Sequence, residues 1–301
     1  MKKSPFLLAS GLLVGLFAFF LLLAVAVANL VGQPTRFTLG DKVGVIEVFG
    51  VISDSREIIE HLHRFRDNDS IKAIVLRIDS PGGGVGASQE IHDEVRAIDQ
   101  IKPVVASMGS VAASGGYYIA APARKIIANP GTITGSIGVI MQFANFQELL
   151  KKIGLYNEVV KSGPHKDLGS PVRPMSEADR RILQAMIDDV HDQFVASVAV
   201  GRDLDPAQVR ELADGRIFTG RQAREFGLVD ELGNLQVAIA RAGQLARIEG
   251  EPTVVYPAKQ KPRLLDYLIE ESQLRLQQVL SRTGNPGLYY LWQGLDQEVS
   301  R

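Results

Sequence analysis

The sequence predicts an α/β fold, because short apolar runs alternate with helical patterns along most of the chain. Three runs are apolar and rich in β-branched residues, as buried strands are: 43–48, 73–78 and 103–107. Between them, residues 56–66 have the spacing of an amphipathic helix, and residues 88–95 begin another. This alternation is typical of a sheet with helices packed against it.

The second half of the chain continues the pattern. Residues 156–160 predict a further strand, and Ser176 begins a long helix with a Ser-Glu-Ala-Asp start signal. Apolar residues follow at helical spacing: Ile182, Leu183, Met186, Ile187, Val190 and Phe194. The pair 205–206, Asp-Pro, begins another helix. Residues 264–280 predict a C-terminal amphipathic helix, and the aromatic run 287–292 predicts a packing or oligomer contact.

The candidate nucleophile is Ser114, in a run of small residues between a predicted strand and a predicted helix start at residues 117–121. The free N–H groups and positive dipole end of a helix favour the anion that forms when a serine attacks a carbonyl. Gly115 and Gly116 allow a substrate backbone to approach closely. A packing turn of small residues explains this segment equally well, so the segment alone decides nothing.

A second glycine-rich loop, residues 79–84, follows a predicted strand and precedes a predicted helix. Such a loop can hold a phosphate, but the chain lacks the Gly-Lys-Ser/Thr of a P-loop and the G-x-G-x-x-G of a dinucleotide site. One backbone N–H of this loop, together with the N–H just after the serine, would form an oxyanion hole with two donors.

The five histidines offer no clear base. His61, His63 and His92 precede the serine on charged segments that we interpret as solvated helix faces. His191 falls in a predicted helix, where we expect a structural or exposed side chain. His165 neighbours a lysine and could touch substrate, but we do not assign it as the base.

Two lysines compete for the base role. A lysine that serves as a base at neutral pH needs a pKa about 3 units below its usual 10.4, a preference of ~4 kcal/mol for the neutral form. Burial against apolar neighbours can supply this. Lys161 ends a predicted strand, while Lys166 lies beyond a Ser-Gly-Pro turn. The residues alone leave both lysines open.

From about Val43 to Leu232 the chain resembles the signal peptide peptidase A family in its short, single-repeat form. The motifs that carry the resemblance occur in one order: 79–84, 112–118, 134–139, 161–167 and 217–230. The resemblance implies a Clp protease/crotonase-like fold with a repeated ββα core, and a Ser/Lys dyad as the catalytic pair.

Carried over by position, the resemblance makes Ser114 the nucleophile, Lys166 the general base, and Gly83 and Gly115 the oxyanion donors. It therefore decides between the two lysines. Clp proteolytic subunits instead use a His after the serine, and residues 129–138 contain none, so a Ser-His-Asp triad is disfavoured. Longer family members carry two halves, so we expect this chain to form a homo-oligomer whose neighbouring subunits complete each site.

The N-terminus predicts a membrane anchor. Residues 5–31 carry no charge, and a helix of that length exceeds the roughly 30 Å hydrocarbon core of a bilayer. Lys2 and Lys3 precede it, so the positive-inside rule predicts a cytoplasmic N-terminus and an extracytoplasmic remainder. A cleaved signal peptide is the alternative, because residues 24–28 are small, but the apolar stretch is longer than such peptides need.

We expect five segments: a cytoplasmic N-terminus over 1–4, a transmembrane anchor over 5–31, a linker over 32–42, a Ser/Lys peptidase domain over 43–250 and a C-terminal extension over 251–301. A net charge of −1 gives no reason to expect nucleic acid binding. Without cysteine the chain has no disulfides and no thiolate metal site, and no zincin-like spacing occurs. We therefore expect neither a cofactor nor a metal.

These observations predict a membrane-anchored serine endopeptidase that degrades remnant signal peptides and similar apolar peptides. Its partners would be peptide substrates, membrane lipid and further copies of itself. A crotonase-type acyl-CoA enzyme is one alternative, since that fold also uses two backbone donors. A non-catalytic membrane scaffold of the same fold is the other.

Overall fold

The computed structural model describes residues 15–23, 40–258 and 288–292, in two units, Met1–Gly40 and Asp41–Arg301. In the first unit, residues 15–23 are helical. No helix within the described residues is long and apolar enough to cross a bilayer. Most of the predicted anchor, and all of the predicted helix 264–280, lie outside the described residues.

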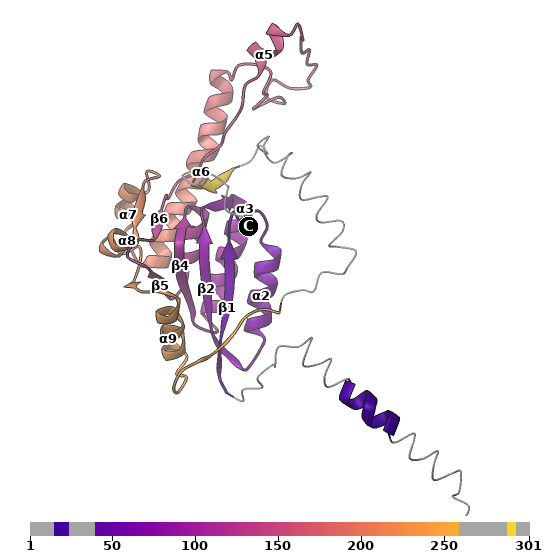
Figure 1. Ribbon diagram of the computed structural model, residues 1–301. Helices are drawn as coiled ribbons and strands as arrows, with labels where there is room; N and C mark the ends of the chain where they lie inside the picture. Colours follow the sequence, from indigo (N-terminus) through magenta and orange to yellow (C-terminus); the bar gives the residue numbers. More distant parts are fainter. Residues whose placement is uncertain (1–14, 24–39, 259–287, 293–301) are drawn as a thin grey trace, which may run out of the picture. The chain divides into compact units, whose positions relative to one another are not determined.

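The second unit is built on a mainly parallel sheet (Figure 1). Its centre is β1 (Lys42–Phe49), β2 (Ile71–Ser80) and β4 (Val104–Ala113), which pair side by side in parallel. The shorter strands are β5 (Lys125–Ala128), β6 (Ile133–Gly135), β7 (Ile217–Thr219), β8 (Glu231–Leu232) and β9 (Thr253–Val255). Only β7 is antiparallel to its neighbour in this sheet. The α/β prediction is confirmed.

Helices cover both faces of the sheet, because successive side chains of each strand point to opposite sides. On β1, Val43 and Val45 pack against α9 (Leu235–Leu245), whereas Ile46 and Val48 belong to the larger core on the other face. That larger core also receives α2 (Arg56–Arg66), α3 (Val85–Asp99), α4 (Gly115–Ala120) and α6 (Glu177–Arg202). With both faces buried, the central strands are almost continuously apolar.

The remaining helices are α5 (Gln147–Lys152), α7 (Pro206–Leu212) and α8 (Gly220–Glu225). The predicted start of α6 is confirmed: Ser176 and Asp179 form a reciprocal capping box. Figure 1 shows α6 running from the core towards α5, which lies away from the sheet. We call residues 142–175, which include α5, the arm.

Two predictions about strands need correction. Residues 156–160 form no strand; they lie exposed in the arm, where no sheet edge is present to pair with them. Their β-branched residues therefore gave a misleading signal. The strand predicted to end at Ser107 continues to Ala113, because small residues pack closely there. A Cβ on Gly109, for example, would lie 2.5 Å from the Asp79 carboxylate.

Parts of the predicted C-terminal extension join the second unit. Strand β9 extends the sheet beyond β1. The three-residue strand β10 (Tyr289–Leu291) pairs antiparallel with β3 (Gly82–Gly84), which is the second glycine-rich loop. We predicted a packing or oligomer contact for this aromatic run, and it packs within its own chain.

Candidate active site

Ser114 lies at the junction of β4 and α4, as the sequence predicts. Its backbone has φ 53° and ψ −117°, a strained conformation for a residue with a side chain. Two backbone hydrogen bonds hold it there: its N–H donates to Gly135 O at 2.8 Å, and its carbonyl accepts from Tyr118 N–H at 2.8 Å. A strained serine on a sharp strand-to-helix turn is the geometry of a nucleophile elbow.

The glycine-rich loop β3 lies directly beside this turn. A Cβ placed on Gly82 would be 2.7 Å from Gly115 N, and one placed on Gly115 would be 3.0 Å from Gly83 N. Gly82 also has φ +104°, which disfavours any side chain. The structure thus brings together Ser114, Gly83 and Gly115, three of the four residues predicted for the site.

A cavity of about 400 Å³ opens beside Ser114. Its lining includes Ser136, the serine of the 134–139 motif, which also has a positive φ of 48° and donates its N–H to Arg216 O at 2.8 Å. From α6, Ile187 and His191 also line the cavity.

His191 is the histidine of this cavity. Its Nε2 atom is buried and has no hydrogen-bond partner in the described part of the chain. The signal lay in the helical spacing: Gln184, Ile187, Asp188 and His191 share one face of α6, and that face lines the serine's cavity. The sequence predicts a structural or exposed side chain for His191 and does not place it beside the serine.

Lys166 does not line the Ser114 cavity of its own chain. It is exposed in the turn 164–169 of the arm. Among the described residues its ammonium group has no hydrogen-bond or ion-pair partner. Within one chain, therefore, the structure does not bring the predicted base to the predicted nucleophile.

Lys161 differs from Lys166 because its ammonium group has two hydrogen-bond partners. It donates to Asp167 Oδ1 at 2.6 Å and to Pro164 O at 3.0 Å. Arg173 binds the same carboxylate at 2.9 Å, and these two cations, Arg173 foremost, hold the pKa of Asp167 well below its usual range. The Lys161 ammonium group is thus occupied by partners within the arm, and Lys161 does not line the serine's cavity.

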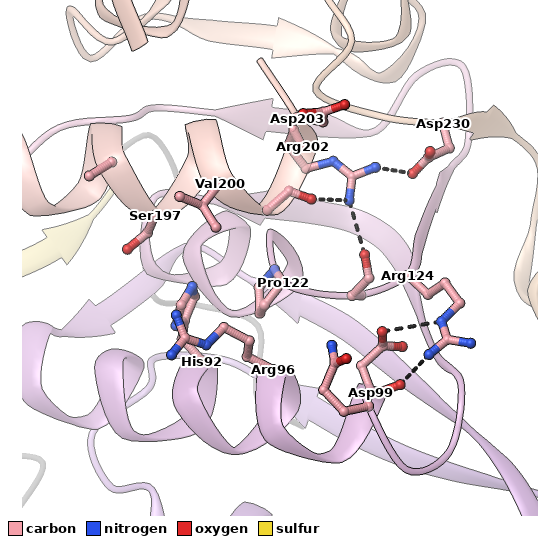
Figure 2. Close-up of a pocket in the computed structure, with 14 residues that line it drawn as sticks. His92, Arg96, Asp99, Pro122, Arg124, Ser197, Val200, Arg202, Asp203 and Asp230 are labelled. Carbon is pink, nitrogen blue, oxygen red and sulfur yellow. Dashed lines mark hydrogen bonds and ion pairs between the residues drawn. The ribbon is translucent and has the colours of Figure 1, made fainter. Parts of the chain in front are cut away.

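A larger cavity of about 600 Å³ lies elsewhere, between α3 and the end of α6. Figure 2 shows that two of its arginines point at carboxylates: Arg124 lies 3.2 Å from Asp99, and Arg202 is paired with Asp230. Because these arginines are ion-paired and Ser114 is absent from the lining, we do not assign the chemistry to this cavity. Throughout the described residues, no group of three His, Asp or Glu side chains could hold a metal ion.

Comparison with known proteins identifies the family. Residues 96–249 match the profile of peptidase family S49, and this stretch includes Ser114 and Lys166. The chain belongs to peptidase family S49. Residues 45–133 also match the Clp protease profile, in agreement with the parallel-rich sheet.

Relatives within the family support this. A putative protease of Synechocystis is 46% identical over 217 residues, which cover 72% of this chain and 78% of that protein. A putative signal peptide peptidase of Enterococcus faecium is 40% identical over 212 residues, 66% of this chain and 62% of that protein. A chloroplastic serine protease of Arabidopsis thaliana is 34% identical over 232 residues, which cover 71% of this chain and 34% of that protein. The predicted resemblance is confirmed: the protein is a serine-type peptidase that acts on peptides.

Proposed function

We propose that Ser114 is the nucleophile, that the N–H groups of Gly83 and Gly115 bind the oxyanion, and that Lys166 of a neighbouring subunit is the general base. The observation that carries this proposal is the strained backbone of Ser114 beside two converging glycine amides. Donors fixed in advance stabilise the developing negative charge without having to reorganise during the reaction.

The reaction proceeds in two steps. Ser114 Oγ attacks the scissile carbonyl carbon while a neutral Lys166 amine takes the hydroxyl proton. The C–N bond then breaks, Lys166 gives the proton to the leaving amine, and the acyl group stays on Ser114 as an ester. A water molecule, deprotonated by the same lysine, hydrolyses this ester and releases the new carboxylate.

A shared site is supported by the arm. Lys166 lies outside its own serine's cavity, and the arm exposes many large apolar side chains: Phe146, Leu149, Ile153, Leu155, Tyr156, Val159 and Val160. An exposed apolar patch of this kind marks an interaction surface. A second copy docked on the arm would cover this surface and deliver a lysine to the neighbouring serine.

We further propose that residues 5–31 anchor the protein in the membrane, with residues 1–4 in the cytoplasm and the peptidase domain, 43–250, outside it. The support is the uncharged stretch and the Lys2-Lys3 pair that precedes it. In that place the substrates would be remnant signal peptides and similar apolar peptides. The crotonase and scaffold alternatives are disfavoured by the family, and neither needs the serine hydroxyl.

Subunit complementation tests the shared site. Purified Ser114→Ala and Lys166→Ala proteins are each expected to be inactive on an apolar peptide. After mixing and verified co-assembly, random pairing in a closed ring gives about a quarter of the sites an intact serine and an intact lysine. Recovery near that level supports the proposal. Absence of recovery in co-assembled rings contradicts it and puts both residues in one subunit.

A further inference from the structure

Strand β4 contains an irregularity shortly before Ser114. Along β2 the pairing advances two residues, from Ile78 to Ser80. Along β4 it advances four residues over the same distance, from Met108 to Ala112. Residues 109–111 therefore form a β-bulge, which we call the bulge. At this point β4 also changes its other neighbour, from β5 to β6. Bulges that lie next to active sites re-aim a side chain.

The bulge lies opposite Asp79, whose carboxylate binds its backbone. One carboxylate oxygen accepts from Val111 N–H at 3.0 Å, and the other accepts from Ser110 N–H at 3.2 Å. The fit is close, because a Cβ on Gly109 would lie 2.5 Å from the same carboxylate. A bulge interrupts the hydrogen-bond ladder, so its N–H groups need another acceptor. Asp79 supplies that acceptor.

Other side chains hold the carbonyl groups where the bulge begins. Met108 O accepts from Arg77 Nη1 at 3.1 Å and from Asn129 Nδ2 at 3.2 Å. Gly109 O accepts from the Thr132 hydroxyl at 2.6 Å. Arg77 belongs to β2, whereas Asn129 and Thr132 belong to the loop between β5 and β6. The bulge is thus fixed by the elements on both of its sides.

The bulge determines where Ser114 lies. Beyond it, β4 pairs with β6 up to Ala113 and Gly135, and Ser114 N–H then donates to Gly135 O at 2.8 Å. Successive strand residues are about 3.3 Å apart, and a slip of one residue turns every side chain to the opposite face. A misplacement of about 1 Å at the reacting groups can cost about 100-fold in rate.

We propose that Asp79 is a positioning residue for the nucleophile, because its carboxylate holds the bulge that places Ser114 beside the glycine-rich loop β3. The inference rests on the proposed role of Ser114. It assigns no proton transfer to Asp79, whose two oxygens accept from the bulge and which does not line the serine's cavity. None of the bulge residues lines that cavity either, so the effect belongs in kcat rather than in KM.

Steady-state kinetics of the full, assembled protein on an apolar peptide test this. Asp79→Ala removes both acceptors, so kcat should fall about 100-fold while KM stays within about threefold of wild type. Asp79→Asn keeps the shape and one acceptor oxygen, so it should fold and show an intermediate kcat. Asp99→Ala is the matched control, because Asp99 accepts from Val104 N–H at 2.8 Å at the other end of the same strand. It should lower Tm and leave kcat unchanged.

Gly109→Ala examines the same contact from the other side. The nearest atoms to a Cβ at Gly109 all belong to the Asp79 side chain, so this substitution should displace the carboxylate and lower kcat. In the Asp79→Ala background the new Cβ meets only the Cβ of residue 79, at 3.1 Å, and should reduce kcat little further. A double-mutant cycle measures this non-additivity.

The outcomes separate the inference from the proposed function. Equal kcat values for Asp79→Ala and Asp99→Ala overturn the inference, as do fully additive losses in the cycle. If Asp79→Ala does not fold, Asp79→Asn decides, and a wild-type kcat for it contradicts the inference. Ser114→Ala is assayed in parallel. If it is inactive while the Asp79 variants are fully active, only the inference fails; if it is as active as wild type, the proposed function fails as well.

Discussion

The Ser114 turn and the arm represent opposite ways of placing a functional residue. Ser114 is 1% exposed, fixed by backbone hydrogen bonds, and surrounded by glycines whose neighbours leave no room for a Cβ. The arm places Lys166 in an exposed turn, among apolar side chains that face solvent. The proposed nucleophile and oxyanion donors are thus fixed by contacts within one chain, whereas the side chain of the proposed base, Lys166, has no such contacts among the described residues.

This difference has an energetic basis. A strained backbone persists only where the surrounding structure determines it, and the core beneath α4 supplies that constraint. A lysine that must lose its proton needs a dry, apolar environment, which an exposed turn of a single chain does not provide. Assembly would supply this environment by covering the arm.

Peptide hydrolysis should be most sensitive to substitution of the proposed nucleophile, Ser114. Ser114→Ala removes only the hydroxyl, so we expect peptide hydrolysis to fall by at least about a thousandfold while thermal unfolding stays unchanged. Steady-state kinetics and a melting curve check this. Residual activity within about tenfold of wild type, a barrier change of only ~1.4 kcal/mol, would remove Ser114 from its assigned role.

Substitution of the two candidate bases, Lys166 and Lys161, tests the role of the arm. Arginine stays protonated, so Lys166→Arg is expected to be as inactive as Lys166→Ala, whereas Lys161→Arg keeps its ion pair with Asp167 and most of its activity. His191→Gln is the control within the serine's own cavity, and it should stay active. If His191→Gln is inactive and Lys166→Arg is active, the base lies in the same chain as the serine.

The oxyanion loop is expected to show a smaller effect. A Cβ on Gly83 would lie 2.0 Å from Ile52 O, so Gly83→Ala must shift the loop and misplace one donor. We expect kcat to fall about 100- to 1000-fold, the usual loss for one donor. Gly86→Ala is the matched control, because a Cβ there meets nothing within 4 Å. Equal kcat values for the two variants would contradict the assignment of Gly83.

The fold could be predicted because its strands are buried on both faces and its helices carry start signals. The runs at 43–48 and 73–78, the helix 56–66 and the capping box at Ser176 correspond to observed elements. The wrong strand at 156–160 shows the limit of this reasoning. A β-branched run forms a strand only where a sheet edge can pair with it, and sequence spacing does not reveal where the edges lie.

The site could be predicted as far as local backbone chemistry determines it. Turn and helix-start patterns make Ser114 and the N–H after it candidates, the resemblance to the family selects them and Gly83, and the structure brings the three residues together. The sequence did not place His191 in the serine's cavity or Tyr290 against the glycine-rich loop, because each comes from a distant part of the chain. The aromatic run around Tyr290 was noticed, but nothing in its sequence indicates the loop against which it pairs.

The smallest expected effect concerns how firmly the arm is held. Arg173 keeps the pKa of Asp167 and of Asp179 below the usual range, so the folded state binds fewer protons than the unfolded state in acid. Stability is therefore fully present above about pH 4, the ordinary aspartate value, and is lost as the pH falls further. Urea unfolding across pH should show this decline in wild type and a flatter profile in Arg173→Gln.

Arg56→Gln provides the control for that measurement, because its partner Asp54 lies at an exposed position far from the arm in sequence. Its acid profile should follow wild type, since an exposed ion pair contributes little to stability. If Arg173→Gln declines in acid as steeply as wild type, the Arg173 pairs do not cause the acid sensitivity.

Strand β10 is paired along both of its edges, with β3 on one side and with Ile140 on the other, and such a cleft is selective for conformation. A guest must present unpaired N–H and C=O groups along both of its edges, and a helix has already used these groups internally. Within a lipid bilayer an apolar segment stays helical, because each unpaired backbone group there costs several kcal/mol. For the proposed apolar substrates, a hydrophobic segment that is fully embedded would therefore be protected, and it would become cleavable only after it leaves the lipid and unwinds.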